Sequence, residues 1–219
     1  MKIKNLLVFG DSYSTYSGCI PEGYAVYYSK NGSHPEKDFD VTKMELDQTW
    51  WRLFIKETGA NLVMNNSWSG STICYTGYSG DCSKTSSFIY RYRQLLEKGF
   101  FKVNKIDTVI VFGGTNDSWA NAPLGEFKLS DIAEEDLYCA LPAISYFAKT
   151  LRTGLPDARV VFIANCDIKE EIVSAIEKAS ELFGVEAVVL HNVDKYDGHP
   201  TVKGMQQIAE QVIDKLKDK

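Results

Sequence analysis

Five short apolar runs, separated by segments with helical patterns, constrain the fold of this chain more than any other feature. Each run is apolar on both faces, as is typical of parallel strands that helices cover on both sides. Strand–helix alternation of this kind predicts a doubly wound α/β sandwich. The predicted strands span residues 5–9, 61–65, 108–112, 159–164 and 187–190.

The segments between these strands carry apolar residues at helical spacing, and several of them end at a glycine, which suits a helix C-terminus. The longest candidate, 135–151, contains Pro142, which we expect to kink the helix or divide it in two. The other predicted helices span residues 49–58, 87–98, 170–183 and 202–217.

Residues 18–48 form the one irregular stretch, rich in Tyr, Gly, Ser and Asp. It is longer than a usual strand-to-helix connection, and long loops in compact domains are often functional. Two interpretations are open: an insertion on the substrate side of the molecule, or a solvated loop without a role. Because the chain shows no linker or repeat, we predict a single domain over residues 1–219 that includes this insertion.

Composition argues against several classes of protein. The 24 Lys and Arg residues are outnumbered by 29 Asp and Glu residues, and the net charge of −5 disfavours nucleic-acid binding. No stretch reaches transmembrane length, and the first ten residues lack the pattern of a signal peptide, so we predict a cytoplasmic protein without a membrane span. We expect no metal and no other cofactor, since neither an HExxH motif nor a phosphate-binding glycine motif occurs. No pattern predicts an oligomeric state.

The cysteines form no CxxC motif, and we expect reduced structural thiols. Cys74 and Cys82 share a predicted loop and could pair if the protein were exported. The five cysteines are Cys19, Cys74, Cys82, Cys139 and Cys166.

Four polar loops attract attention. Three of them, 9–14, 65–72 and 112–117, directly follow predicted strands, and the fourth, 197–200, lies between the last strand and the last helix. Each alone fits an ordinary turn. In an open α/β sheet, however, ligands bind at the carboxyl ends of the strands, and all four loops belong to that edge.

Together the four loops contain the groups that acyl transfer needs. A serine becomes a good nucleophile only when a base removes its proton, and histidine titrates in the right range. Glycine and asparagine N–H groups can stabilise the oxyanion that then develops. His34 lies in the irregular stretch and His191 ends a strand, which favours a structural role, so His199 is the best-placed base for Ser12.

The four loops also resemble sequence blocks of a known superfamily. The segments GDSYS at 10–14, NSWSGST at 66–72, GGTND at 113–117 and DGHPTVKGM at 197–205 look like blocks I, II, III and V of the SGNH hydrolases, the GDSL-like lipases and acylhydrolases. Their order and spacing cover nearly the whole chain. The resemblance implies a flavodoxin-like three-layer α/β/α sandwich with a five-stranded parallel sheet, and an ester-hydrolysing serine enzyme.

The resemblance also implies roles for individual residues. Ser12 is similar to the family's nucleophile, whose backbone N–H also contributes to the oxyanion hole. Gly70 would supply a second backbone N–H, and Asn116 a side-chain N–H. His199 would be the general base.

One departure from the family concerns the carboxylate. The family usually places an aspartate three residues before the histidine, where this chain has Tyr196. Asp197, two residues before His199, is our first candidate, with Asp194 as the alternative acid. A third interpretation is a Ser–His dyad assisted by a backbone carbonyl.

Aromatic residues surround the blocks and suit stacking on sugar rings or shielding of an acyl group. The alternative is that they only pack the loops against the sheet. Candidates for substrate binding are Trp68, Trp119 and Tyr13, and further aromatic residues nearby are Tyr16, Tyr75 and Tyr78.

The sequence thus predicts a serine esterase that cleaves a small acyl ester, such as an acetylated carbohydrate, through an acyl-enzyme. A lysophospholipase or thioesterase with a longer acyl groove is the alternative within the same chemistry. A non-catalytic ligand-binding module on the same fold is the alternative from another class.

Overall fold

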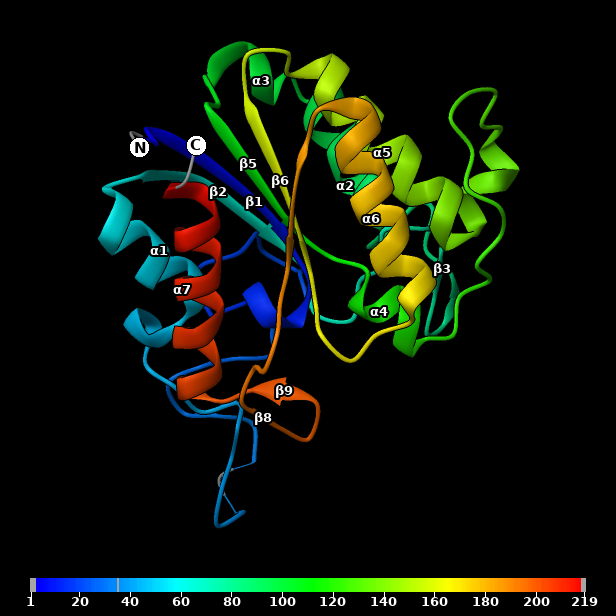
Figure 1. The fold of residues 1–219 in the computed structure, drawn as a ribbon. Helices are drawn as coiled ribbons and strands as arrows, with labels where there is room; N and C mark the ends of the chain where they lie inside the picture. The colour runs from blue at the N-terminus through cyan, green and yellow to red at the C-terminus, as the bar shows by residue number, and fades with distance from the viewer. Residues whose placement is uncertain (1–2, 35, 218–219) are drawn as a thin grey trace.

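A parallel five-stranded sheet lies at the centre of the computed structural model, which describes residues 3–34 and 36–217 (Figure 1). Residues 1–2 and 218–219 of the predicted domain, and position 35 of the predicted insertion, lie outside the described residues. The strand order is β2-β1-β5-β6-β7. The strands are β1 (Asn5–Gly10), β2 (Asn61–Ser67), β5 (Thr108–Phe112), β6 (Arg159–Ala164) and β7 (Glu186–Val189).

Helices cover both faces of the sheet. Successive residues of a strand point to opposite faces, so each strand places apolar side chains on both sides of the sheet. In β1, Leu7 and Phe9 belong to one buried cluster, and Leu6 and Val8 belong to the other. The first face is covered by α2 (Phe88–Glu97), α5 (Ala140–Gly154) and α6 (Glu170–Phe183), and the second by α1 (Trp50–Thr58) and α7 (Val202–Lys217) (Figure 1). The predicted three-layer α/β/α sandwich with a five-stranded parallel sheet is confirmed.

The strand order brings three of the polar loops together. From β1 the chain crosses to β2 on one side, and β5 then pairs with the other side of β1. Gly10, the last residue of β1, lies opposite Ser67 of β2 and Phe112 of β5. The loops that follow these three residues therefore meet at the point where the strand order reverses, where open α/β sheets bind ligands.

The predicted helix over 135–151 is wrong at its N-terminal end. A 3₁₀ turn, Glu134–Tyr138, is followed by Cys139 in an extended conformation, and α5 begins at Ala140. Pro142 therefore lies in the first turn of α5, where a backbone N–H has no partner within the helix. It neither kinks α5 nor divides it.

Several short elements were not predicted, because each is too short to show a periodic pattern. They are α3 (Phe100–Val103), α4 (Thr115–Trp119), the 3₁₀ turns Ser12–Ser14 and Leu46–Gln48, and two small hairpins, β3 (Thr76–Gly77) with β4 (Gly80–Asp81) and β8 (Lys195–Tyr196) with β9 (His199–Pro200).

The insertion at 18–48 lies beside the β8–β9 hairpin (Figure 1), where the ring of Phe39 packs edge-on against Tyr196 with centroids 4.9 Å apart.

Three chemical features of the described residues bear on function. No helix among them has the length and apolar character needed to cross a membrane. Within residues 3–34 and 36–217, no group of three or more His, Cys, Asp or Glu side chains could hold a metal ion. All five cysteines are free thiols, Cys74 and Cys82 among them.

Candidate active site

The turn after β1 presents Ser12 at the carboxyl edge of the sheet. The side chain of Asp11 caps the short 3₁₀ turn by accepting a hydrogen bond from the Tyr13 N–H at 3.0 Å. Only glycine fits at position 10, because a Cβ atom there would overlap the side chain of Ser14. Ser12 is thereby held in a tight, fixed turn with only 3% of its surface exposed.

His199, on β9, contacts Ser12 directly. The imidazole Nε2 lies 3.0 Å from Oγ of Ser12, and Nδ1 lies 3.2 Å from the main-chain carbonyl oxygen of Asp197. A carbonyl oxygen only accepts hydrogen bonds, so we assign the proton of the neutral ring to Nδ1. Nε2 is then the acceptor, in the orientation that a base for Ser12 requires.

The surroundings keep His199 neutral near pH 7. Burial lowers the pKa of His199 below its ordinary value of 6.5. The hydrogen bond to the Asp197 carbonyl and the negative charge of Asp197 oppose this shift, and the positive charge of Lys195 adds to it. A neutral imidazole can take up the serine proton, which a protonated one cannot.

Neither candidate carboxylate forms a hydrogen bond with His199 in the part of the chain that the structure describes. Asp197 meets the imidazole through its main-chain oxygen, and its side chain is exposed. The Asp194 carboxylate instead accepts a hydrogen bond from the hydroxyl of Thr201. This geometry favours the third interpretation, a Ser–His pair assisted by a backbone carbonyl.

Asn116 lies in the first turn of α4, which begins immediately after Gly114 in a left-handed conformation. Its Nδ2 donates to the carbonyl oxygen of Ser71 at 2.9 Å, and its Oδ1 accepts from the Tyr78 hydroxyl at 3.1 Å. These partners determine which end of the amide is nitrogen. An amide nitrogen carries two hydrogens, and the contact with Ser71 uses one of them.

Gly70 lies in the turn after β2 with a φ of +79°, a conformation that glycine adopts without strain. This turn is fastened to the end of β1, because the Trp68 N–H donates to the carbonyl oxygen of Gly10 at 3.0 Å. The Ser71 hydroxyl closes the turn by donating to the Trp68 carbonyl oxygen at 2.7 Å. The loops that carry Ser12, Gly70 and Asn116 are thus bonded to one another.

Two buried ionisable residues whose roles sequence reasoning missed, Asp117 and Arg91, hold these loops together. Asp117 accepts the backbone N–H groups of Ile73 and Cys74 at 2.9 and 3.0 Å. Arg91 of α2 donates to the Ser71 hydroxyl at 3.0 Å and to the Gly10 carbonyl oxygen at 3.2 Å. Burial lowers the pKa of Arg91 to about 9, so the guanidinium stays charged at neutral pH.

Tyr13 is fully buried, and the expectation that it contacts substrate does not fit this position. Its hydroxyl donates to the carbonyl oxygen of Gly198 and accepts from Asn165 Nδ2 at 3.1 Å. Tyr13 therefore anchors the hairpin that carries His199.

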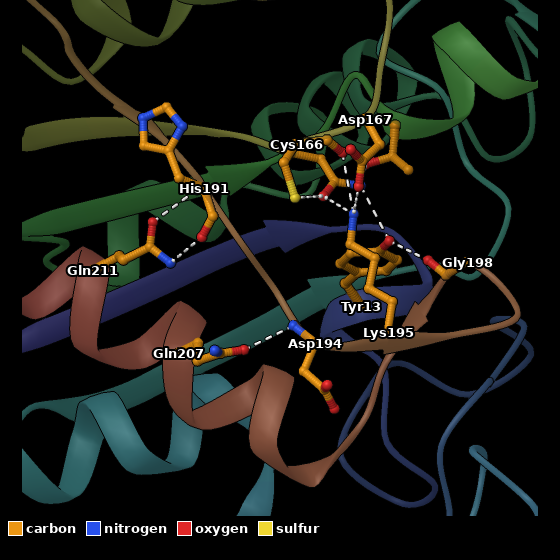
Figure 2. A network of polar contacts seen from close by, with 11 residues as sticks. Tyr13, Cys166, Asp167, His191, Asp194, Lys195, Gly198, Gln207 and Gln211 are labelled. Carbon is orange, nitrogen blue, oxygen red and sulfur yellow. Dashed lines mark hydrogen bonds and ion pairs between the residues drawn. The ribbon is translucent and has the colours of Figure 1, made fainter.

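A second anchor for the hairpin is Lys195, which is seen with Tyr13 in Figure 2. Its ammonium group donates to Asn165 Oδ1 at 3.0 Å, to the Cys166 carbonyl oxygen at 3.1 Å and to Asp167 Oδ2 at 3.1 Å. The β8–β9 hairpin is thereby tied to the loop after β6.

The other two candidates for substrate binding, Trp68 and Trp119, are partly exposed, whereas Tyr16 and Tyr75 are buried. Trp119 packs edge-on against His199, with ring centroids 5.7 Å apart. Trp68 packs on Tyr24 at a centroid distance of 4.3 Å and, with Gly70 and Tyr78, lines a cavity of about 330 Å³.

The other two histidines have different surroundings. The ring of His191 is exposed, and its main chain exchanges two hydrogen bonds with the side chain of Gln211, at 2.8 and 2.9 Å (Figure 2). His34 lies in the insertion with Nδ1 3.8 Å from a carboxylate oxygen of Glu36.

Comparisons with known proteins identify the family of this chain. The family model of the GDSL-like lipases/acylhydrolases matches residues 4–216. The chain belongs to this family. It is accordingly an ester-hydrolysing serine hydrolase of the GDSL type.

Solved structures resemble this GDSL-like hydrolase over its full length. A structure described as a GDSL-like lipase from Bacteroides ovatus is 36% identical, with a TM-score of 0.86 and 100% of both chains covered. One from Bacteroides uniformis is 37% identical, with a TM-score of 0.85, and covers 100% of this chain and 97% of its own. A family two carbohydrate esterase from Clostridium thermocellum shares the fold at 18% identity, with a TM-score of 0.66 and coverage of 100% and 65%. A search of curated proteins found no match.

Proposed function

We propose that this hydrolase cleaves short acyl esters of carbohydrates through an acyl-enzyme on Ser12. Oγ of Ser12 attacks the ester carbonyl carbon while Nε2 of His199 takes the hydroxyl proton. The tetrahedral intermediate collapses, the bond to the alcohol oxygen breaks, and His199 gives its proton to that oxygen. Water then repeats the sequence on the acyl-enzyme, releasing the acid and the free serine.

The observation that carries this proposal is the 3.0 Å contact between Ser12 Oγ and His199 Nε2 at the carboxyl edge of the sheet. In the proposed mechanism, the oxyanion is stabilised by the backbone N–H groups of Ser12 and Gly70 and by the second Nδ2 hydrogen of Asn116. The Asp197 carbonyl oxygen keeps the proton of His199 on Nδ1 and so leaves Nε2 free to accept.

The residues that line the cavity beside Gly70 favour a substrate with a short acyl group. The cavity of about 330 Å³ there is bordered by Trp68 and Tyr78 together with small and polar residues, including Ser69, Gly80 and Asp81. A long acyl chain gains ~0.8 kcal/mol for each methylene only when apolar walls bury it. This lining favours a short acyl group over the chains of a lysophospholipase or thioesterase substrate.

Two further points support a carbohydrate as the alcohol. Partly exposed aromatic rings lie near the proposed catalytic residues: Trp68, packed on Tyr24, lines the cavity beside Gly70, and Trp119 packs against His199. Flat aromatic faces suit the apolar faces of sugar rings. The carbohydrate esterase from C. thermocellum shares this fold.

The test is a panel of chromogenic esters from acetate to palmitate, assayed beside acetylated mono- and oligosaccharides. We expect the highest kcat/KM at acetate and release of acetate from the sugars. A maximum among the long chains would instead identify a lipid-type acyl hydrolase. No turnover of any ester by folded protein would support the non-catalytic binding module.

A further inference from the structure

A tyrosine from the insertion, Tyr27, stacks on the imidazole of His199. The two ring centroids are 3.8 Å apart and the planes are inclined by only 11°. The other aromatic neighbours of the imidazole, Tyr13 and Trp119, lie farther away and more steeply tilted, at 5.5 Å and 54° and at 5.7 Å and 72°. Tyr27 therefore covers one face of the imidazole, while the other two rings border it.

Tyr27 is fixed in this position from both sides of the site. Its backbone N–H donates to the hydroxyl of Thr15, next to the turn that carries Ser12, at 3.0 Å. The neighbouring Tyr28 is fully buried and donates its hydroxyl to the carbonyl oxygen of Pro200 at 2.9 Å. The insertion is thus bonded both to the Ser12 turn and to the strand of His199.

No carboxylate among the described residues contacts His199. The imidazole therefore lacks the negatively charged partner that a Ser–His–Asp triad provides. When His199 takes the proton of Ser12, the ring becomes positively charged in a partly buried position. The Asp197 carbonyl is a neutral dipole and stabilises this charge less than a carboxylate would. The face of an aromatic ring carries negative potential and attracts a cation that lies over it.

The groups that face the imidazole act in different directions. The carbonyl oxygen and the charge of Asp197 raise the pKa of His199, and the charge of Lys195 lowers it. Burial raises the pKa of Tyr27 to about 12, so its phenol is neutral at working pH. Tyr13 is also protonated, since burial raises its pKa well above the ordinary value. Tyr27 therefore acts on His199 through its ring face and not through a phenolate charge.

We infer that Tyr27 is a positioning residue for His199: its ring holds the plane of the imidazole and stabilises the imidazolium in the transition state. The inference rests on the Ser12–His199 chemistry proposed above. Under this inference the insertion at 18–48 takes part in the reaction by positioning the base, and not by contacting the substrate.

Two variants of Tyr27 distinguish the effect of the ring face from the effects of the hydroxyl and of side-chain volume. Tyr27→Phe keeps the stacked ring, and Tyr27→Leu keeps apolar bulk without a π face. On an acetate ester, we expect kcat within about threefold of wild type for Tyr27→Phe. We expect a roughly threefold to thirtyfold loss of kcat for Tyr27→Leu, with little change in KM. Phe39→Leu, which removes an aromatic ring of the same insertion that packs on Tyr196, is the matched control and should behave as wild type.

The second readout is the pKa of His199 itself, measured by NMR in a Ser12→Ala background. The chain has three histidines, so the signals can be assigned by replacing one at a time. We expect Tyr27→Leu to lower the pKa of His199 by about half a unit relative to Tyr27→Phe. This measurement needs no turnover, so it tests Tyr27 even if the proposed ester substrates are wrong.

Two results would overturn the inference. Equal kcat and equal His199 pKa in Tyr27→Phe and Tyr27→Leu would show that the ring face is irrelevant. A rise in KM with unchanged kcat would identify a substrate-contacting wall. If Tyr27→Leu does not fold by circular dichroism, Tyr27→Met replaces it, and the same two readouts decide. Failure of the proposed function appears separately, as wild-type protein without esterase activity.

Discussion

The main-chain carbonyl oxygen of Asp197 lies 3.2 Å from Nδ1 of His199, where a Ser–His–Asp triad places a carboxylate. Asp197 reaches this position in a left-handed conformation, with a φ of +49°, and is followed by Gly198 at +76°. A side chain at position 198 would lie 3.1 Å from the ring of Trp119, so the tight turn depends on glycine. The backbone of this turn, and not an acidic side chain, orients the imidazole.

The first prediction concerns the side chain of Asp197. Asp197→Asn keeps the carbonyl oxygen, and asparagine tolerates a positive φ. We expect kcat/KM on an acetate ester to fall less than tenfold, compared with the loss on the order of 10⁴ seen when a triad aspartate becomes asparagine. The acidic limb of the pH profile should move to lower pH, because the negative charge that raises the pKa of His199 is gone.

Asp194→Asn is the companion variant, since the Asp194 carboxylate bonds to Thr201 and not to His199. It should lower thermal stability more than turnover. A loss of a thousandfold or more in either folded variant would restore a Ser–His–Asp triad and contradict the backbone-carbonyl arrangement.

The second prediction concerns Asn116. Removing one oxyanion donor typically lowers kcat by roughly 10²–10³, and we expect a loss of this size in Asn116→Ala with little change in KM. Tyr78→Phe is the matched control, because it removes the hydroxyl that bonds to Asn116 Oδ1 and leaves the amide N–H in place. Steady-state kinetics that show equal losses in both variants would make the hydrogen-bonded pair, and not the N–H donor, the important feature.

The third prediction concerns the pH dependence of stability at Asp11. Burial raises the pKa of Asp11 from 3.8 to about 7. Between these values the folded protein holds a proton that the unfolded chain has lost, so stability falls as the pH rises towards 7. Asp11→Asn cannot ionise and can still cap the turn at Ser12. Its Tm relative to wild type should therefore increase from pH 5 to pH 8, and an unchanged difference between these pH values would argue against a raised pKa.

The elements that could be predicted from the sequence are those with local signals. The strands and long helices follow from apolar periodicity, and the loops containing Gly10, Gly70 and Gly114 follow from glycine and polar residues at strand ends. Periodicity misled us before α5, because Leu137 in the 3₁₀ turn Glu134–Tyr138 continues the helical spacing of the apolar residues that follow. The break at Cys139 is a change in backbone direction that the pattern of residue types does not indicate.

The supporting residues of the site depend on contacts between distant segments. Nothing near Tyr27 in the sequence indicates that it stacks on His199, because the contact arises only when the insertion folds against the β8–β9 hairpin. Arg91 did leave a signal, since it lies on the same helical face as the apolar residues Phe88, Tyr92 and Leu95. A charged residue on a buried face is costly unless it is hydrogen-bonded, and this signal could have pointed to Arg91.

The measurement that tests the central claim most directly is covalent labelling of Ser12 by a fluorophosphonate, followed by intact-mass spectrometry and peptide mapping. We predict a single adduct on wild-type protein, located on Ser12, and none on Ser12→Ala. His199→Ala, which removes the base 3.0 Å from Oγ, should slow labelling strongly while leaving the fold intact. Undiminished labelling of folded Ser12→Ala, or an adduct at another residue, would contradict Ser12 as the nucleophile and with it the proposed mechanism.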